Sequence, residues 1–395
     1  MKNKINAVVL ACSVGLCSAD VFAVEEGGLR LSGSGFLTVG LGKMLGGDRA
    51  TVVDFNCPCF TSDYAQTGVY DGRGGVQWRP DTRLGLQGRA ELADSGLSFT
   101  AQAVARGANG GQGDVQWAYG SYLLNDSTSI QLGRKRLPMF YYSDTQDVGF
   151  ALPWTHLPPQ LYGWEAVNYN GVNLLHRSTW GQWGATLNVL AGREHLRDSG
   201  YWKIYNGQHS RTDVNWDNIV GADLTLVRDW FETRFVYIQS NTVRSNPTGV
   251  WNGVTYTPSP DPYLNGKVTR QRIYSAAFNV DYADWLMLSE FLYIARPGAA
   301  FEDTAQLVAL GNRIAPNWQA MVTLSRYQGK AVTALGGDPL AQEGHVSRSL
   351  TVRRDLSPTS AIKVQFDSQK DRGGPRWIPR FGNARLLTLS YDRVF

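Results

Sequence analysis

The residues that could carry out nucleophilic or acid–base chemistry lie far apart in this sequence. Its five histidines fall between His156 and His345, and no motif joins one of them to a serine and a carboxylate, as a hydrolase requires. The Gly-x-Ser-x-Gly and His-Glu-x-x-His signatures are absent. Gly33-Ser34-Gly35 stands in an alternating segment and not in a phosphate-binding loop. The sequence therefore predicts no catalytic residue and no cofactor.

The first 23 residues have the pattern of a secretory signal peptide. Lys2 and Lys4 precede an apolar run, and Val21-Phe22-Ala23 supplies small residues at the two positions that determine cleavage. We therefore predict that residues 1–23 are removed on export and that 24–395 form one domain. The formal net charge of +4 is only weakly basic, and the absence of a Lys/Arg cluster argues against a nucleic-acid partner.

The mature chain keeps two cysteines, which form the segment Cys57-Pro58-Cys59. The compartment outside the inner membrane is oxidising, which favours a disulfide between Cys57 and Cys59. Free thiols are a second interpretation. A metal site would need more ligands than this segment offers, and we predict none.

Short alternating segments run along the whole mature chain and predict an all-β protein. Gly and aromatic residues are abundant, and Val, Thr, Tyr and Trp recur in runs of period two. No stretch after the leader reaches the roughly 18 to 20 apolar residues of a membrane helix. The pattern predicts 16 strands, at 29–43, 82–92, 97–106, 115–124, 128–137, 167–177, 182–193, 219–228, 231–241, 272–282, 285–296, 304–314, 318–327, 346–355, 361–369 and 384–395.

The predicted connections alternate between tight turns and long loops. The tight turns include 93–96, 125–127, 229–230, 283–284, 315–317 and 357–359. The long loops are 44–81, 139–166, 194–218, 242–271 and 328–345. Short turns on one rim and long loops on the other are typical of a transmembrane antiparallel up-and-down β-barrel. An even strand count lets the first strand pair with the last and leaves no edge.

The two faces of several strands differ as a barrel wall in lipid requires. Ile362, Val364 and Phe366 alternate with Lys363 and Gln365 in the fifteenth predicted strand. The apolar face suits lipid, and the charged face suits a water-filled lumen and not a packed core. Five tryptophans beside the short turns indicate an aromatic girdle at the membrane interface: Trp180, Trp183, Trp230, Trp285 and Trp318.

The chain ends on an alternating strand whose last residue is aromatic. This strand resembles the C-terminal strand of bacterial outer-membrane β-barrels, in which Tyr391 and Phe395 would form the signal read by the barrel-assembly machinery. Arg393 departs from that pattern, because an apolar residue is usual there. With sixteen strands and a lumen wide enough for water, the chain resembles the general bacterial porins, which are usually trimeric. Gly33, along with other glycines of the first strand, would permit close subunit contact.

The resemblance implies that the third extracellular loop, which joins the fifth and sixth predicted strands at 139–166, folds into the barrel and narrows the pore. Its aromatic residues would be costly in water, and its acids would face a basic ladder on the wall. The expected constriction joins Arg83, Arg89 and Arg106, which point inward by parity, with strand-end bases and loop acids: Arg134, Lys135, Arg136, Asp144, Asp147 and Glu165. Opposed charges would create a transverse field that sorts ions, with lumen charges that confer no selectivity as the alternative interpretation.

The expected function is passive diffusion of small hydrophilic solutes and ions through the outer membrane of a Gram-negative bacterium. The basic excess predicts a modest anion preference. A substrate-specific channel, for example for small organic anions, is the main alternative, and a barrel enzyme or an adhesin is a remote one. The expected partners are the lipid bilayer, outer-leaflet lipopolysaccharide, the barrel-assembly machinery and two further copies of the chain.

Overall fold

The computed structural model describes residues 22–48, 54–378 and 381–395, which form a closed β-barrel. The predicted signal peptide lies outside the described residues, apart from Phe22 and Ala23. Within the described part of the chain, no helix has the length and hydrophobicity needed to cross a membrane.

Sixteen antiparallel strands make the barrel wall, and each pairs with its neighbours in chain order. The predicted barrel is therefore confirmed. The strands of the wall are β2 (Leu29–Gly47), β5 (Arg83–Leu92), β6 (Leu97–Arg106), β7 (Gly113–Asn125), β8 (Thr128–Arg136), β9 (Asn168–Trp180), β10 (Trp183–Leu196), β11 (Asp213–Arg228), β12 (Phe231–Ser245), β15 (Thr269–Tyr282), β16 (Trp285–Ala295), β17 (Phe301–Ala315), β18 (Trp318–Ala331), β19 (Gly344–Ser357), β20 (Ser360–Asp371) and β21 (Ala384–Val394).

The barrel closes where β2 pairs with β21 on one side and β5 on the other. The terminal residue completes this seam, because Phe395 and Gly35 exchange two backbone hydrogen bonds. A short strand, β1 (Phe22–Glu26), pairs with the part of β2 that extends beyond β21. Closure leaves no open sheet edge in the wall, which is the condition for a sheet to span a bilayer.

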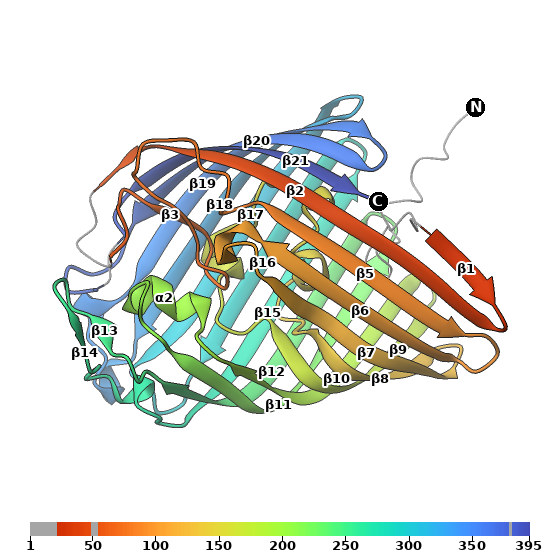
Figure 1. Cartoon of the computed structure of the whole chain (residues 1–395), viewed down its shortest axis with the longest axis horizontal. Helices are drawn as coiled ribbons and strands as arrows, with labels where there is room; N and C mark the ends of the chain where they lie inside the picture. The colour runs from red at the N-terminus through yellow and green to blue at the C-terminus, as the bar shows by residue number, and fades with distance from the viewer. Residues whose placement is uncertain (1–21, 49–53, 379–380) are drawn as a thin grey trace.

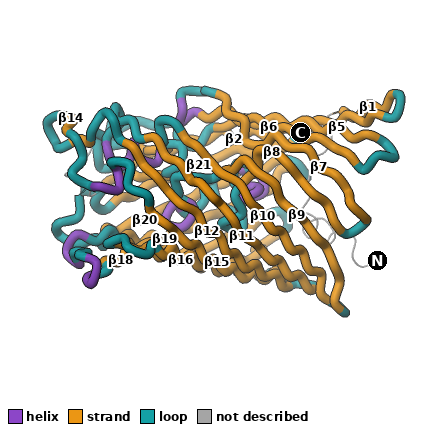
Figure 2. The backbone as a smooth tube through the Cα atoms, turned by 90° about the horizontal axis from the view of Figure 1, so that it is seen from below, coloured by secondary structure: helices purple, strands orange, loops and turns teal. Residues whose placement is uncertain are grey.

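The two rims of the barrel differ, as Figures 1 and 2 show. Tight turns join the strands at one end, the turn rim, and non-glycine residues with positive φ, such as Asp94, Asp229 and Asn317, stand in them. Asp and Asn tolerate this conformation better than most residues. The long loops gather at the opposite end, the loop rim.

The loops at the loop rim carry small elements of their own. They are β3 (Phe60–Asp63), β4 (Gly68–Tyr70), η1 (Gly107–Asn109), α2 (Gly200–Asn206), β13 (Val250–Trp251), β14 (Tyr256–Thr257), η4 (Pro262–Leu264), η5 (Thr333–Leu335) and η6 (Pro339–Ala341). The loop between β8 and β9 contains η2 (Ser143–Thr145), η3 (Gly149–Ala151) and α1 (Pro159–Tyr162).

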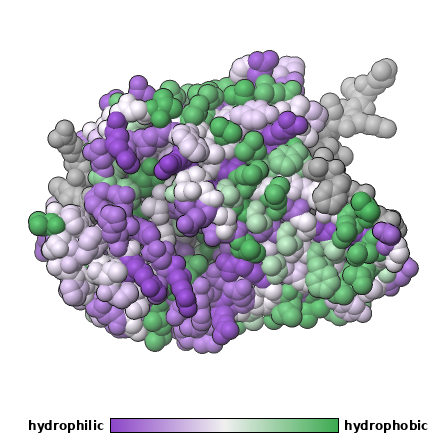
Figure 3. All heavy atoms as spheres, in the orientation of Figure 1, coloured by the Kyte–Doolittle hydropathy of each residue, from purple (hydrophilic) through white to green (hydrophobic). Residues whose placement is uncertain are grey.

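The outer face of the wall is apolar in the predicted register. Val364 and Phe366 are exposed outside the barrel, whereas Lys363, Gln365 and Asp367 are buried inside it. In Figure 3, hydrophobic residues are densest toward the end that carries β1, and hydrophilic residues toward the loop rim. Of the five girdle tryptophans, Trp180, Trp230, Trp285 and Trp318 are exposed and Trp183 is half-buried.

The inner face is not polar throughout, and this differs from the sequence-based expectation of a charged lumen. An apolar inner strip lies on β12 and β15 to β18, where hydrophobic side chains alternate with equally hydrophobic outward residues. The strip consists of Val236, Ile238, Ile273, Leu288, Leu292, Leu307 and Met321, all of which are buried. Apolar residues on both faces indicate that this part of the wall is covered from inside as well.

Candidate functional site

The loop between β8 and β9, the third loop, lies inside the barrel and covers the apolar inner strip. Phe140, Trp154 and Leu161 of this loop are buried in the same hydrophobic cluster as the strip. Each such side chain contributes about 1.5–3 kcal/mol when it leaves water. Trp154 also donates its indole N–H to the hydroxyl of Thr323 on β18, at 2.8 Å. The loop is therefore held against the far wall by burial, and its inward course needs no ligand.

A single carboxylate on the apolar strip fixes the two ends of the loop. Glu290 of β16 is fully buried. It accepts the backbone N–H of Tyr141 at 2.8 Å and the hydroxyl of Tyr162 at 2.6 Å. Sequence reasoning missed this residue, although a lone acid within the hydrophobic run 285–295 is the signal that could have found it.

A buried lysine holds the middle of the loop. Lys363 of β20 donates to the carbonyl oxygens of Gly149, Leu152 and Trp154, at 2.6 to 3.0 Å, and its ammonium lies 3.0 Å from the carboxylate of Asp392. A Cβ added at Gly149 would lie 2.0 Å from an Asp392 oxygen. Glycine is therefore required for the loop to approach the wall this closely.

A buried histidine joins the third loop to the first. Nδ1 of His156 lies 2.9 Å from Asp81 of the first loop, and Nε2 lies 3.4 Å from Asp367 of β20. Burial alone would lower the pKa of His156, but the two carboxylates outweigh burial and raise the pKa to about 10. The side chain is therefore an imidazolium at neutral pH, and it links two loops and the wall.

The predicted constriction acid Asp147 is buried in a fixed ion-pair cluster. It accepts from Arg106 at 2.8 Å and also pairs with Arg136 at the end of β8. Burial would raise the pKa of Asp147, but the two guanidinium groups hold it well below its usual range. Arg83 stands beside this cluster with two guanidinium nitrogens unpartnered among the described residues. The cluster anchors the loop, and Arg83 adds an uncompensated positive charge.

Two of the predicted constriction residues lie elsewhere. Arg134 has the same parity as the exposed Ile130 and Leu132 and faces the outside of the barrel, where it forms two hydrogen bonds with Glu194. Glu165 is buried against Arg244 on β12, at 2.6 and 2.8 Å, so it does not face the basic row. Parity alone could have excluded Arg134, whereas the position of Glu165 depends on the course of the loop.

The charges that are accessible in the lumen are few. The carboxylate of Asp144 is exposed and has no hydrogen-bond partner within the described part of the chain. It is close enough to Lys135 to interact with it electrostatically. The ammonium of Lys135 lies 4.9 Å from the ring centre of Tyr119. Arg89 is also exposed, with Glu91 at 2.6 Å. An acid of the third loop therefore faces bases of the β5–β8 wall.

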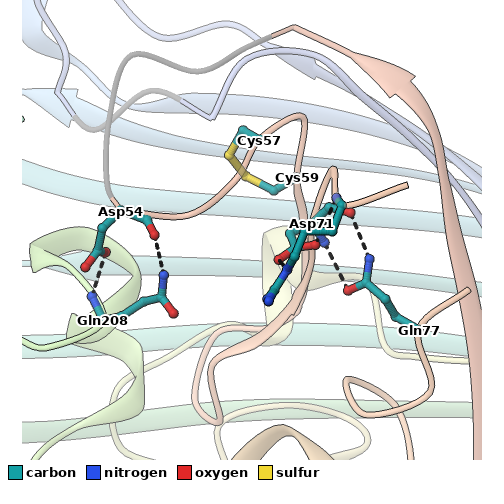
Figure 4. Close-up of a disulfide and its surroundings, with 7 residues drawn as sticks. Asp54, Cys57, Cys59, Asp71, Gln77 and Gln208 are labelled. Atoms are coloured by element: carbon teal, nitrogen blue, oxygen red, sulfur yellow. Dashed lines mark hydrogen bonds and ion pairs between the residues drawn. A yellow bond between two sulfur atoms is a disulfide. The ribbon is translucent and has the colours of Figure 1, made fainter. Parts of the chain in front are cut away.

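The first loop carries the two cysteines, and they form a disulfide, Cys57–Cys59 (Figure 4). Nearby, Asp54 accepts the backbone N–H of Gln208 at 2.8 Å, which ties the first loop to the loop that contains α2. Asp71 and Gln77 are hydrogen-bonded within the first loop. The disulfide therefore lies among loop–loop contacts at the loop rim.

Comparisons with known proteins give a fold and no sequence relative. No protein-family model and no curated protein matches the sequence. The solved structure of DcaP, an outer membrane channel of Acinetobacter baumannii, aligns over 94% of this chain and 99% of its own, with 11% identity and a TM-score of 0.58. An anion-selective porin from Comamonas acidovorans aligns over 93% and 100%, with 12% identity and a TM-score of 0.56.

A third structure, the outer-membrane protein OmpT of Vibrio cholerae, aligns over 95% of this chain and 100% of its own, with 8% identity and a TM-score of 0.57. These similarities extend over the whole barrel, and identity this low carries the fold alone. The closed sixteen-stranded wall agrees with that comparison. The chain therefore has the fold of the bacterial outer-membrane porins.

Proposed function

We propose that the protein is an outer-membrane porin through which small hydrophilic solutes and ions diffuse passively. The observation that carries this proposal is the exposed Asp144 of the third loop, which lies close enough to Lys135 of the barrel wall to interact with it electrostatically. A sixteen-stranded barrel is wide enough for water, and opposed charges on either side of an aqueous gap sort ions. Two of the similar structures have titles that name a channel and an anion-selective porin.

The test is conductance in a planar lipid bilayer. Purified protein should insert and give discrete, ohmic conductance steps at neutral pH. A barrel enzyme or an adhesin would give no such steps, so a protein that inserts without conducting would refute the proposal.

A modest anion preference follows from the charges near the third loop. Arg89 and Lys135 supply two positive charges and Asp144 and Glu91 two negative ones, and the buried guanidinium group of Arg83 adds a third positive charge. Asp147 and Glu165 do not enter this balance, because each is buried in an ion pair. The preference should be strongest at low salt, since exposed charges are screened over about 10 Å at 0.1 M.

We also propose that the protein is a homotrimer, joined through the outer face of β2 and β5 to β8. The glycines of β2 do not support this by themselves, because Gly35, Gly40 and Gly42 make room for Phe395, Asp81 and Tyr70 of the same chain. Instead, small residues outline two adjoining shallow grooves on this outer face: Gly33, Gly88, Ala90, Ala101, Ala103, Ala118 and Gly120. One of the similar Vibrio cholerae structures is described as a trimer form.

The location of the protein is proposed from its two ends. The signal peptide at 1–23 would direct export to the periplasm, and Tyr391 and Phe395 would present the terminal strand to the barrel-assembly machinery. The apolar outer face and the exposed tryptophans at the turn rim suit a bilayer whose outer leaflet contains lipopolysaccharide. Cell fractionation with the assembly machinery depleted tests this: the protein should then accumulate unassembled in the periplasm.

The second candidate function is a substrate-specific channel. An aromatic cavity at the loop rim favours it, because a nonspecific pore has no need of a site that retains one solute. Saturation of solute flux with concentration would separate this function from simple diffusion.

A further inference from the structure

A cavity of about 180 Å³ lies at the loop rim, above the third loop. The loops that precede β9, β11, β15, β17, β19 and β21 surround it, together with the loop-rim ends of β11, β12, β15, β17 and β18. Nine aromatic residues line its walls, which are Trp164, Tyr201, Trp202, Tyr205, Trp216, Tyr263, Phe301, Tyr327 and Trp377. Of the residues predicted for the constriction, Glu165 lines this cavity and the others do not.

The aromatic walls are rigid because the rings pack on one another. The rings of Trp164 and Tyr327 pack edge to face, with their centres 6.2 Å apart. The ring centres of Tyr201 and Tyr205 of α2 lie 4.9 Å apart. The indole of Trp202 donates to Glu165 at 2.6 Å. Preformed apolar walls of this kind hold ring-shaped solutes at little entropic cost.

Both guanidinium groups that line the cavity are paired with carboxylates. Arg244 is paired with Glu165, and Arg296 is paired with Asp303. Glu343 accepts from His345 at 2.8 Å and from the hydroxyl of Tyr205 at 3.1 Å. The carboxylates that pair with the two guanidinium groups leave no free cation for an anionic solute.

Three polar groups of the cavity wall lack a partner among the described residues. They are Oγ1 of Thr269, Nε of Arg296 and the indole N–H of Trp377. Thr269 is only 4% exposed, so its hydroxyl is buried. A buried donor or acceptor left unsatisfied costs about 1–3 kcal/mol, and a ligand with hydroxyl groups would recover part of that cost.

We propose that this cavity binds a neutral, single-ring polyhydroxylated solute of monosaccharide size. The apolar face of such a ring packs on the aromatic walls, and its hydroxyls bond to Thr269, Arg296 and Trp377. A cavity of about 180 Å³ is smaller than the roughly 300–1,000 Å³ pockets of drug-sized ligands and suits one ring. This inference rests on the proposed channel function and names the class of solute retained above the pore.

The test is a binding titration of the purified, detergent-solubilised protein with D-glucose and D-galactose, in which binding is monitored by ligand-observed NMR. At least one sugar should bind saturably. Trp377→Phe keeps a six-membered aromatic ring but removes the five-membered ring of the indole with its N–H, so the dissociation constant should rise roughly three- to tenfold. Trp377→Ala should weaken binding further. The matched control is Trp180→Phe at the turn rim, where Trp180 is 63% exposed, and it should leave binding unchanged.

Three results would overturn the inference. They are the absence of saturable binding for both sugars, a Trp377→Phe variant that matches the control, and tighter, competing binding of tetramethylammonium or benzoate. Bilayer conductance is measured separately. Conductance without sugar binding removes this inference and leaves the channel intact, whereas sugar binding without conductance removes the channel and leaves the site.

Discussion

At the scale of single residues, the charges inside the barrel divide into two kinds. Asp147 and Glu165 are buried in ion pairs that hold the third loop in place. Asp144, Lys135 and Arg89 are accessible from the lumen. Sequence parity placed Arg83, Arg89, Arg106 and Lys135 on the inner face, but it could not separate the two kinds, because that depends on which loop atoms cover each side chain.

Removing the exposed acid should change ion selectivity alone. Asp144→Asn nearly preserves volume and removes a negative charge that has no ion-pair partner, so the reversal potential at low salt should shift toward anions. Asp126→Asn, in a tight turn at the turn rim, is the matched control and should have no effect. Equal reversal potentials for Asp144→Asn and the control would contradict the assignment of Asp144 to the constriction.

Removing the buried acid should instead destabilise the loop. Asp147→Asn leaves Arg106 and Arg136 buried together without their counter-charge, and breaking a buried pair in this way costs about 3–5 kcal/mol. We expect a lower urea midpoint and faster proteolysis of the third loop than in Asp144→Asn. If both variants unfold at the wild-type urea concentration, the buried cluster does not anchor the loop.

The histidine contact should fail at alkaline pH. The pKa of His156 in the folded protein, about 10, lies above its ordinary value of 6.5. Its stabilisation is therefore complete below about 6.5 and is lost as the pH rises through about 10. Open-channel current noise should increase between pH 8 and pH 10.5 in the wild type. The open-channel current of His156→Gln should be noisy already at pH 8. An equal increase in current noise for the wild type and the variant between pH 8 and pH 10.5 would count against the contact.

At the scale of elements, the sequence predicted every barrel strand but not all of their ends. The alternation of β11 was recognised from Ile219, whereas the strand begins at Asp213, because a bulge between Asp217 and Val220 interrupts the period. The inward course of the third loop was expected from the porin resemblance and from its aromatic residues. The apolar inner strip, on which those aromatic residues pack, does not follow from the sequence pattern, because period-two alternation assigns one apolar face to each strand.

The close approach of the third loop to β21 can be tested without removing any contact. A Cβ at residue 149 would collide with Asp392 and Thr38, so Gly149→Ala should displace the middle of the loop. Both the conductance and the frequency of gating events should rise. Gly75→Ala, where a Cβ meets open space, is the control. Wild-type gating in Gly149→Ala would mean that the loop does not touch the wall there.

At the scale of the whole molecule, the proposed trimer depends on the grooved outer face. A Cβ at Gly88 meets nothing within 4 Å, so Gly88→Phe should leave the barrel folded while filling both grooves. The detergent-solubilised mass should fall from that of a trimer to that of a monomer. Val322→Phe adds a ring to an outward position on the other side of the barrel and should stay trimeric. A trimeric Gly88→Phe protein would place the interface elsewhere.

The central claim is that this barrel encloses an aqueous path whose ion preference is set by the charges Arg83, Arg89, Lys135, Glu91 and Asp144. The most direct test is the reversal potential of single channels in potassium chloride gradients of equal ratio at low and high mean salt. The account predicts a modest anion preference near 0.1 M that disappears near 1 M, where the screening length falls to about 3 Å. Cation selectivity at low salt, a preference independent of salt, or the absence of conductance would contradict it.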